Sequence, residues 1–375
     1  MNIFYIGLEP ISERFVKNYF LRDLVEANYR ITYLYLNYSK IKVPSKAKLK
    51  KINQLEIHSN NDLSLFVKNN NLSSNFIVIL FLPYGNFEKN IYTLFCGSKM
   101  KLIYFDWGSY PISISYKNNR ILLFILNNFI VCLLRTLYRK LIIRNSFPID
   151  TLFFSGHSPR TLHFFSPIHK LNIDFFDVVS FNNIKNKVYE SKRQYAVFLD
   201  VNIINHPDFD LLSIKKIDAV NYYKNINDFF SYIEDKYDVD IVIAAHPTLE
   251  VSEFNKYNGR RVVKSKTAEL VTYSKFVISH HSTAISFALL AFKPIIFIYN
   301  NDIANQLTKN VFRLILGLSY QLNQPFINIS VSKEFDNFSL TYNEDFYKKF
   351  LYKYIYTGKP FSQPSNTFLS HFKYY

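Results

Sequence analysis

The stretch 239–299 constrains the fold more than any other part of the chain. It contains an apolar, β-branched run at 240–245 (DIVIAA), and a second such run follows at 276–279. Uninterrupted runs of this length are typical of strands buried on both faces of a parallel sheet. The second run leads through a polar turn, 280–283, into a segment that predicts a helix over 284–292, and then into a third apolar run. Strand, turn, helix and strand form a βαβ unit, so we expect a parallel sheet with ligands at the carboxyl ends of its strands.

Polar side chains follow both of these predicted strands. His246 and Pro247 come directly after the first one, where proline ends an interior strand and leaves the imidazole at its carboxyl end. His281, Ser282 and Thr283 occupy the turn before the predicted helix. Hydroxyl groups and the free backbone N–H groups of a helix start meet the positive end of the helix dipole, which favours an anion. We therefore expect this set of residues to bind a phosphate group.

The rest of the chain predicts two domains of the same kind. With 375 residues, 49% of them hydrophobic, the chain is long enough to bury two full cores. A helix is predicted from Ser12, a favourable N-cap residue, to about residue 26, and residues 363–366 are predicted to form a loop. The segment 182–193 is polar and basic without apolar periodicity, as inter-domain linkers are. Further strands are predicted at 3–6, 29–36, 76–82, 101–105, 151–155, 195–199 and 326–329.

The expected fold class is α/β, with two Rossmann-like parallel-sheet domains facing a central cleft. The first domain is expected to cover 1–185, and the second, which contains the candidate phosphate-binding residues, 194–335. Residues 336–375 are expected to form a helix and a tail that packs back on the first domain.

Composition excludes several classes of protein. The eight glycines are too far apart for a G-x-G-x-x-G or P-loop sequence, so neither a dinucleotide-binding protein nor a P-loop NTPase is expected. Cys96 and Cys132 lie in apolar helical contexts, which suits a reducing compartment without disulfides. Met1 leads directly into a predicted strand, so we expect no secretory signal. No nucleic-acid-binding motif accompanies the net charge of +16, and anionic substrates or a membrane surface are the partners expected instead.

Two basic regions bear on a membrane partner. The loop 42–51 is rich in lysine, which suits either a solvated surface or an anionic membrane. Residues 120–144 predict an apolar helix with basic residues at both ends, and its apolar run, 121–134, is too short to span a bilayer. Such a helix belongs either to the core or, lying flat, to a membrane surface. A cytoplasmic protein, peripheral on the inner face of the cytoplasmic membrane, is the expected localisation.

A carboxylate at a strand end of the first half is a further candidate for the functional site. Asp106 follows the strand predicted at 101–105 and precedes Trp107 and Gly108. A turn of this kind can hold a carboxylate rigidly toward a ligand, although Asp106 could also do no more than cap the turn. The further candidates for donor binding are Gly7, Asp200 and Glu269.

The order of three short motifs resembles that of bacterial GT-B sialyltransferases and polysialyltransferases. Those families have an acidic-acidic-glycine turn, a His-Pro pair and a Ser-Ser/Thr pair. This chain has Asp106-Trp-Gly, His246-Pro247 and Ser282-Thr283 in the same order. In the second half the resemblance extends to the predicted helix that contains Glu269, whereas in the first half it depends on one turn.

The resemblance implies an inverting, metal-independent glycosyltransferase with a CMP-activated nonulosonic acid as donor. Sialic, pseudaminic or legionaminic acid would pass to a glycan or lipid-linked glycan acceptor in surface-polysaccharide synthesis. The resemblance implies that Asp106 deprotonates the acceptor hydroxyl, while His246-Pro247 and Ser282-Thr283 hold the CMP phosphate. Trp107 replaces the second acid of the first motif, which leaves other carboxylates as rival bases. These rivals are Asp200, Glu9 and Glu13.

Other readings of the sequence stay open. A GT-B transferase that uses a UDP-sugar, a GDP-sugar or CMP-Kdo is the alternative enzyme, and a non-catalytic sugar-nucleotide-binding assembly protein is the alternative class. Asp208/Asp210 and Asp238/Asp240 could suggest a metal site of the other glycosyltransferase fold. The second pair stands at the entry of a buried strand, at the wrong end of the sheet, and a charged loop explains both pairs. We therefore expect no metal and no cofactor besides the activated sugar.

Overall fold

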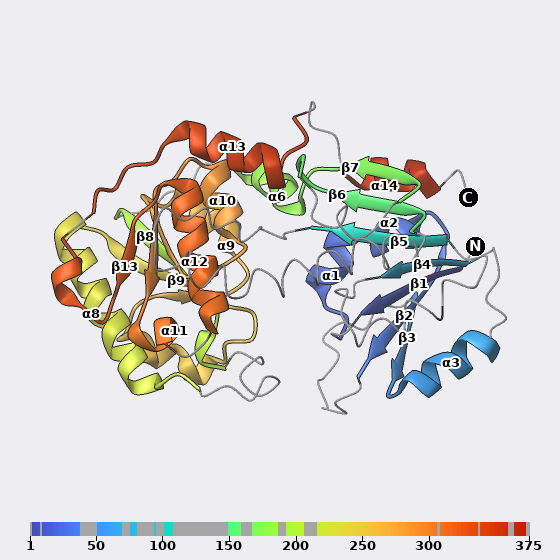
Figure 1. The fold of residues 1–375 in the computed structure, drawn as a ribbon, viewed down its shortest axis with the longest axis horizontal. Helices are drawn as coiled ribbons and strands as arrows, with labels where there is room; N and C mark the ends of the chain where they lie inside the picture. Colours follow the sequence, from blue (N-terminus) through green and yellow to red (C-terminus); the bar gives the residue numbers. More distant parts are fainter. Residues whose placement is uncertain are drawn as a thin grey trace, which may run out of the picture. The chain divides into compact units, whose positions relative to one another are not determined.

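The computed structural model divides the chain into two compact α/β units (Figure 1). The first unit contains the described residues up to Phe176 together with those from Thr357 onward, and the second runs from Asp177 to Tyr356. The structure describes residues 2–7, 10–37, 51–69, 76–80, 94, 101–107, 149–158, 167–186, 193–205, 216–305, 308–336, 338–358 and 364–372.

The first unit is built on a seven-stranded parallel sheet with the order β3-β2-β1-β4-β5-β6-β7. Its order reverses between β1 and β4, which makes that point the topological switch where ligands of such sheets bind. The strands are β1 (Asn2–Gly7), β2 (Arg30–Leu36), β3 (Ile52–Ile57), β4 (Phe76–Leu80), β5 (Lys101–Asp106), β6 (Thr151–Phe154) and β7 (His169–Asn172). The helices are α1 (Glu13–Asn18), α2 (Leu21–Glu26), α3 (Asn60–Asn69) and α14 (Pro364–Phe372).

The helix predicted over 12–26 is divided in two. Ser12 caps α1 as expected, because its Oγ accepts a hydrogen bond of 3.2 Å from the backbone N–H of Phe15. The helix ends before Phe20, whose φ of 60° places it in the left-handed region. In this conformation the Phe20 ring is buried next to Phe105 and Phe368, and apolar burial of a large ring outweighs the cost of an unfavourable backbone.

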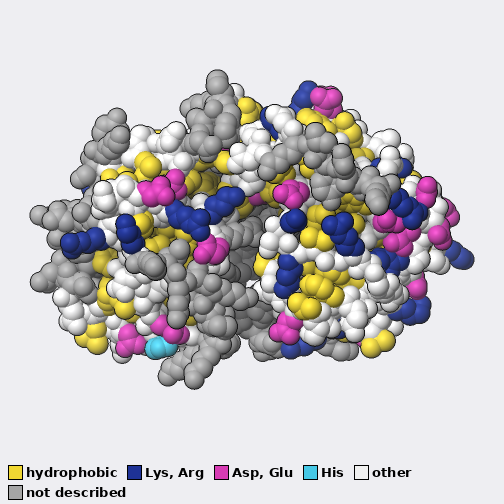
Figure 2. Space-filling model, turned by 180° about the vertical axis from the view of Figure 1, so that it is seen from behind, with side chains coloured by type: hydrophobic (Ala, Val, Ile, Leu, Met, Phe, Trp, Pro, Cys, Tyr) yellow, Lys and Arg dark blue, Asp and Glu magenta, His cyan; other side chains and the backbone are white. Residues whose placement is uncertain are grey.

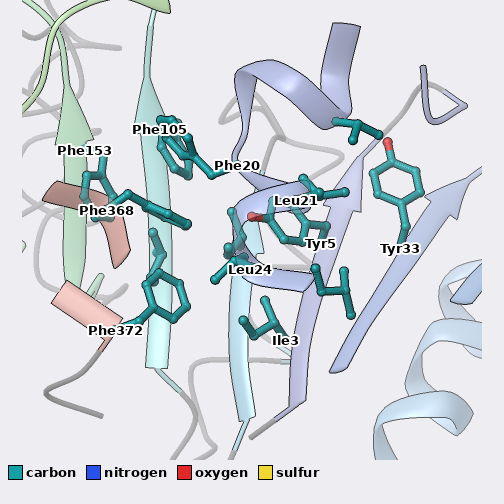
Figure 3. Packing of buried hydrophobic residues seen from close by; sticks show 14 of the residues in the cluster. Ile3, Tyr5, Phe20, Leu21, Leu24, Tyr33, Phe105, Phe153, Phe368 and Phe372 are labelled. Atoms are coloured by element: carbon teal, nitrogen blue, oxygen red, sulfur yellow. The ribbon is translucent and has the colours of Figure 1, made fainter. Parts of the chain in front are cut away.

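The C-terminal segment belongs to the core of the first unit (Figure 3). The prediction of a loop at 363–366 is wrong, because helix α14 begins at Pro364. Proline suits the first turn of a helix. Phe368 and Phe372 are almost completely buried against β5, β6 and α2 residues. Nε2 of His371 lies 2.7 Å from Oγ1 of Thr151, a contact that links residues 220 positions apart in sequence. The end of the chain therefore completes the fold of its beginning.

Gly7, a predicted donor-binding residue, has a packing role in this unit. A Cβ at Gly7 would lie 2.5 Å from the hydroxyl oxygen of Tyr33 on β2. We expect Gly7→Ala to lower the free energy of unfolding by about 1–3 kcal/mol, the usual cost of overpacking a core. Tyr33→Phe removes the clashing oxygen, so the double variant Gly7→Ala/Tyr33→Phe should recover most of the loss. Chemical denaturation measures both. Equal destabilisation of the single and double variants would show that the clash is not the cause.

The second unit has a six-stranded parallel sheet with the order β10-β9-β8-β11-β12-β13. Its order reverses between β8 and β11. The strands are β8 (Tyr195–Leu199), β9 (Asp240–Ala244), β10 (Val262–Val263), β11 (Val277–Ser279), β12 (Ile295–Tyr299) and β13 (Phe326–Asn328). The helices are α6 (Phe176–Ile184), α8 (Ala219–Tyr237), α9 (Thr267–Tyr273), α10 (Ile285–Leu290), α11 (Asn301–Asn305), α12 (Thr308–Leu322) and α13 (Glu344–Tyr354), with 3₁₀ turns η3 (Ile203–Asn205), η4 (Val251–Tyr257) and η5 (Ser332–Glu334).

The division between the units falls earlier in the chain than the linker predicted at 182–193. Helix α6 belongs to the second unit, because buried Asp177 accepts a hydrogen bond from the hydroxyl of buried Ser286. The Tyr273 hydroxyl also donates a 2.5 Å bond to the carbonyl of Ile184 at the other end of α6. Helix α13, which was assigned to the tail, belongs to the second unit as well, and there Tyr347 donates to the Lys293 carbonyl.

The basic loop predicted at 42–51, apart from Lys51, and the helix predicted at 120–144 lie outside the described residues. Within the part of the chain that the structure describes, no helix is long and apolar enough to cross a bilayer. Figure 2 shows Lys and Arg side chains interspersed with Asp, Glu and apolar side chains on the face that it displays. The described side chains of this face thus form no block of a single charge.

Candidate functional site

The register of the second sheet brings three of the predicted turns to one edge. Leu199, the last residue of β8, is opposite Ala244 of β9 on one side and Ser279 of β11 on the other. The three strands are parallel and end together, so the turns that follow them lie side by side. These turns begin at Asp200, Ala245 and His280. The candidate phosphate-binding residues therefore lie at the switch point of the sheet, where open α/β sheets bind ligands.

Asp200 holds two of these turns together. Its carboxylate accepts backbone N–H groups from Asn202 at 2.8 Å and from His246 at 3.2 Å, and it also hydrogen-bonds to the Tyr257 hydroxyl. Burial raises the pKa of Asp200, while these hydrogen bonds act in the opposite direction. Because protein donors surround the carboxylate, the geometry favours a structural role for Asp200 over the roles of donor ligand or general base.

His246 and Pro247 open an exposed turn at the end of β9. Nδ1 of His246 lies 2.7 Å from the Thr248 hydroxyl and 3.3 Å from the Thr248 backbone nitrogen, which donates to it. The Thr248 hydroxyl in turn accepts a 3.0 Å bond from Nδ2 of Asn202. The ring of His246 is thus fixed by the loop after β8 as well as by its own turn. No sequence motif includes Thr248 or Asn202.

Ser282 and Thr283 form the turn that precedes α10. Oγ of half-buried Ser282 accepts the backbone N–H of Ala284 at 3.2 Å, and the Ser282 carbonyl accepts that of Ile285 at 3.3 Å. Thr283 is exposed. Helix α10 ends at Leu290 and is therefore shorter than the predicted 284–292. Phe292 has a positive φ of 50°, which is incompatible with a helix that continues to this residue. Both hydroxyl residues remain at the carboxyl edge of the sheet.

The two adjacent histidines have different surroundings. His280 is completely buried, donates through Nδ1 to the Ile298 carbonyl at 2.7 Å, and accepts through Nε2 from the Tyr222 hydroxyl at 2.9 Å. Burial lowers the pKa of His280 to about 4, so the ring is neutral at pH 7. His281, the residue predicted to bind the donor, is half-buried in the turn. His280 therefore anchors the turn that carries His281.

The lowered pKa of His280 predicts a loss of stability in acid. In the unfolded chain the ring binds a proton near pH 6.5, whereas in the folded protein it does so only near pH 4. The free energy of unfolding should therefore fall by about 3 kcal/mol between pH 7 and pH 4 through this group alone. Chemical denaturation at a series of pH values should show this dependence in wild type and not in His280→Gln. His58→Gln, which replaces an exposed histidine, is the control; an identical pH dependence in His280→Gln would contradict the assignment.

Asp106, the candidate general base, ends β5 in the first unit, where it is 9% exposed. The next residue, Trp107, stacks on Tyr19 with ring centroids 5.4 Å apart and makes edge contacts with Phe105. Trp107, which stands where the resembled families have a second acid, therefore fills an aromatic cluster. Gly108 lies outside the described residues.

The other acidic candidates differ in their surroundings as far as the structure describes them. Glu13, a rival base, forms a 2.5 Å surface ion pair with Arg22, and Glu9 lies outside the described residues. Glu269 is half-buried in the first turn of α9. That helix has Lys266 at its N-cap position, without a side-chain cap.

Of the two Asp-x-Asp pairs, Asp238/Asp240 lies within the described residues. Arg193 bridges Asp238 at 2.7 Å and Asp240 at 2.8 Å, at the amino end of β9 and away from the candidate site. This ion pair explains both carboxylates. Asp208 and Asp210 lie outside the described residues. Among the residues that are described, no group of three or more His, Cys, Asp or Glu could hold a metal ion.

Two Rossmann-like domains with parallel sheets define the GT-B fold, and this chain has that fold. Neither a family model nor a curated protein sequence matches the chain. Among solved structures, it is similar to S. aureus MnaA with UDP, with a TM-score of 0.51, 12% identity, and coverage of 100% of this chain and 96% of that one. It is also similar to UDP-GlcNAc 2-epimerase from Methanocaldococcus jannaschii (TM-score 0.47, 11% identity, all of both chains). A third similar structure is the wall teichoic acid polymerase TagF (TM-score 0.46, 12% identity, 99% and 88% covered).

Proposed function

We propose that the protein is a nucleotide-sugar-dependent glycosyltransferase whose second unit binds the donor through its phosphate. The observation that carries this proposal is the position of His246 at the end of β9 and of Ser282 and Thr283 after β11, the two neighbours of β8 at the sheet's switch point. Strand axes two places apart in a sheet are about 10 Å apart, so side chains from the two turns can approach one phosphate group from opposite sides of β8. Hydroxyl and imidazole donors stabilise the charge that grows on a leaving phosphate as the glycosidic bond breaks.

A UDP-sugar is the donor that we propose first. The similarity to MnaA, whose structure holds UDP, supports a uridine nucleotide at this fold position. The CMP-nonulosonate is the second candidate, and the order of Asp106-Trp107, His246-Pro247 and Ser282-Thr283 at strand ends favours it. In either case we propose that transfer inverts the anomeric carbon, requires no metal, and uses Asp106 to accept the proton of the acceptor hydroxyl.

A nucleotide screen by thermal shift tests the proposal. A ligand that binds only the folded state raises the melting temperature, so UDP, CMP and GDP should be compared at equal concentrations. We expect UDP or CMP to stabilise the protein in EDTA as well as without it. Turnover in EDTA should likewise be unchanged, and loss of activity that Mn²⁺ restores would contradict the metal-independent mechanism. No stabilisation by any of the three nucleotides would overturn the proposal.

Alanine variants locate the nucleotide on the structure. Ser282→Ala and Thr283→Ala should each weaken nucleotide binding by about 1–2 kcal/mol through the loss of one hydrogen bond to a charged group. Ser332→Ala, an exposed serine in η5 near a different strand, is the matched control and should bind normally. Unchanged affinity in both turn variants would place the nucleotide elsewhere.

Product analysis distinguishes the enzyme classes. Donor hydrolysis without acceptor, seen with UDP-sugars and absent with CMP-sugars, would select the first donor, and the reverse would select the second. Conversion of a UDP-sugar into its epimer would contradict transfer, and binding without any turnover would indicate a non-catalytic assembly protein. Peripheral contact with the cytoplasmic face of the membrane, through 42–51 and 120–144, stays a prediction.

A further inference from the structure

A directional chain of hydrogen bonds leads to the ring of His246. Its first member is Glu253, whose burial opposes ionisation, although hydrogen bonds from Lys256 and Asn205 outweigh this effect and lower the pKa of Glu253. The ionised carboxylate only accepts, so Nδ2 of Asn205 must donate to it, at 3.0 and 3.3 Å. This bond fixes the orientation of the Asn205 amide.

The orientation of the Asn205 amide determines which groups of Asn202 and Thr248 donate and which accept. Nδ2 of Asn205 also donates to Oδ1 of Asn202 at 3.2 Å, so the amide of Asn202 has its nitrogen toward Thr248. That nitrogen donates to Oγ1 of Thr248 at 3.0 Å, which leaves the Thr248 hydroxyl proton to point elsewhere. Asn202 is held in a left-handed conformation, with φ of 46°, by the bond from its backbone N–H to Asp200. The position of its side chain is thus determined by these hydrogen bonds.

The ring of His246 accepts the hydrogen bond that this hydroxyl donates. Oγ1 of Thr248 lies 2.7 Å from Nδ1 of His246, and the Thr248 backbone N–H donates to the same ring nitrogen at 3.3 Å. A backbone N–H cannot accept, so Nδ1 is the unprotonated nitrogen. In a neutral imidazole the other nitrogen, Nε2, then carries the proton.

We propose that Thr248, oriented by Asn202, Asn205 and Glu253, fixes His246 as the Nε2–H tautomer, so that the neutral ring donates a hydrogen bond to its ligand. This inference rests on the proposed function for the identity of the ligand, a phosphate oxygen of a nucleotide. A neutral ring that already carries a proton on Nε2 cannot accept another there, so His246 acts as a charge-stabilising donor and not as the general base. Thr248 and Asn202 are positioning residues.

Nitrogen-15 NMR of the ligand-free full-length chain tests the tautomer directly. At pH 7.5, wild type should show Nδ1 of His246 as the unprotonated ring nitrogen and Nε2 as the protonated one. Thr248→Val keeps the shape of the side chain and removes the hydroxyl. Only the longer bond of 3.3 Å from the backbone N–H to Nδ1 remains, so we expect a mixture of tautomers. Its affinity for UDP or CMP, whichever stabilises wild type, should fall by about threefold to tenfold. Thr248→Ser retains the hydroxyl and should restore the tautomer and the affinity together.

Either of two results would overturn this inference. Wild type could show a protonated Nδ1, or Thr248→Val could show the wild-type tautomer while remaining folded by circular dichroism. Because the NMR measurement needs no nucleotide, it decides the inference even if no nucleotide binds. Failure of all nucleotides to bind would overturn the proposed function. The NMR result would still decide the tautomer independently.

Discussion

Asp106→Asn should lose sugar transfer by about 100- to 10,000-fold, the range that a positioned general base contributes. Asparagine preserves the size of the buried side chain at the end of β5 and removes its basicity. Nucleotide affinity should be unchanged, because the candidate phosphate-binding turns belong to the second unit. Steady-state transfer assays and nucleotide titration, performed on the same preparation, measure the two quantities.

Asp200→Asn is the comparison that makes this prediction specific. Its carboxylate accepts two backbone N–H groups, and an amide in its place would turn an N–H₂ group toward a donor. We expect a loss of about 2–3 kcal/mol in the free energy of unfolding, the cost of an unsatisfied buried group, together with weaker nucleotide binding. An active Asp106→Asn enzyme, alongside a stable and inactive Asp200→Asn enzyme that still binds nucleotide, would move the base to the second unit.

His246→Ala should lower turnover by about 100- to 1,000-fold, the usual loss when one donor to a developing negative charge is removed. The reason is the position of the ring at the end of β9, beside the β8 turn and held by Thr248. The effect should appear in kcat more than in nucleotide affinity, because the charge on the phosphate grows in the transition state. Single-turnover kinetics with saturating donor separate the two contributions.

His169→Ala provides the control for the loss of a histidine. His169 is exposed and begins β7, so it lies at the amino edge of the first sheet, opposite the edge that carries the strand-end turns. Its replacement should leave turnover unchanged. Wild-type turnover in a correctly folded His246→Ala protein would exclude the charge-stabilising role.

Local patterns in the sequence were enough to predict the fold class. Buried parallel strands are short, apolar and β-branched, and this pattern predicted β1, β2, β4, β5, β6, β8, β9, β11, β12 and β13 to within a few residues. The strands missed were β3, β7 and β10, all of them at or beside the sheet edges, where burial is weaker and polar residues are common. The predicted GT-B fold is confirmed by the two parallel sheets. It could be predicted because parallel βαβ units follow from short-range order in the sequence.

Side-chain partners across the chain could not be predicted in the same way. In the sequence, His280 and His281 are neighbours with the same chemistry. In the structure, His280 is buried and hydrogen-bonded to Tyr222 and Ile298, whereas His281 is half-buried in the turn. Likewise, Asp200 follows a strand as Asp106 does, but only the fold surrounds it with backbone donors. The orientation of a side chain depends on residues that are distant in sequence.

The sequence by itself determined that the chain forms two parallel-sheet units and that His246, Ser282 and Thr283 follow their strands. Only the tertiary structure decided that the tail forms a helix in the core of the first unit, that α6 and α13 belong to the second, and that Thr248 contacts the ring of His246. The physical reason is the distance along the chain over which each kind of interaction acts. Strand and helix periodicity records which face of an element is buried, over a few residues. Hydrogen-bond direction and aromatic packing depend instead on which elements the completed fold brings into contact.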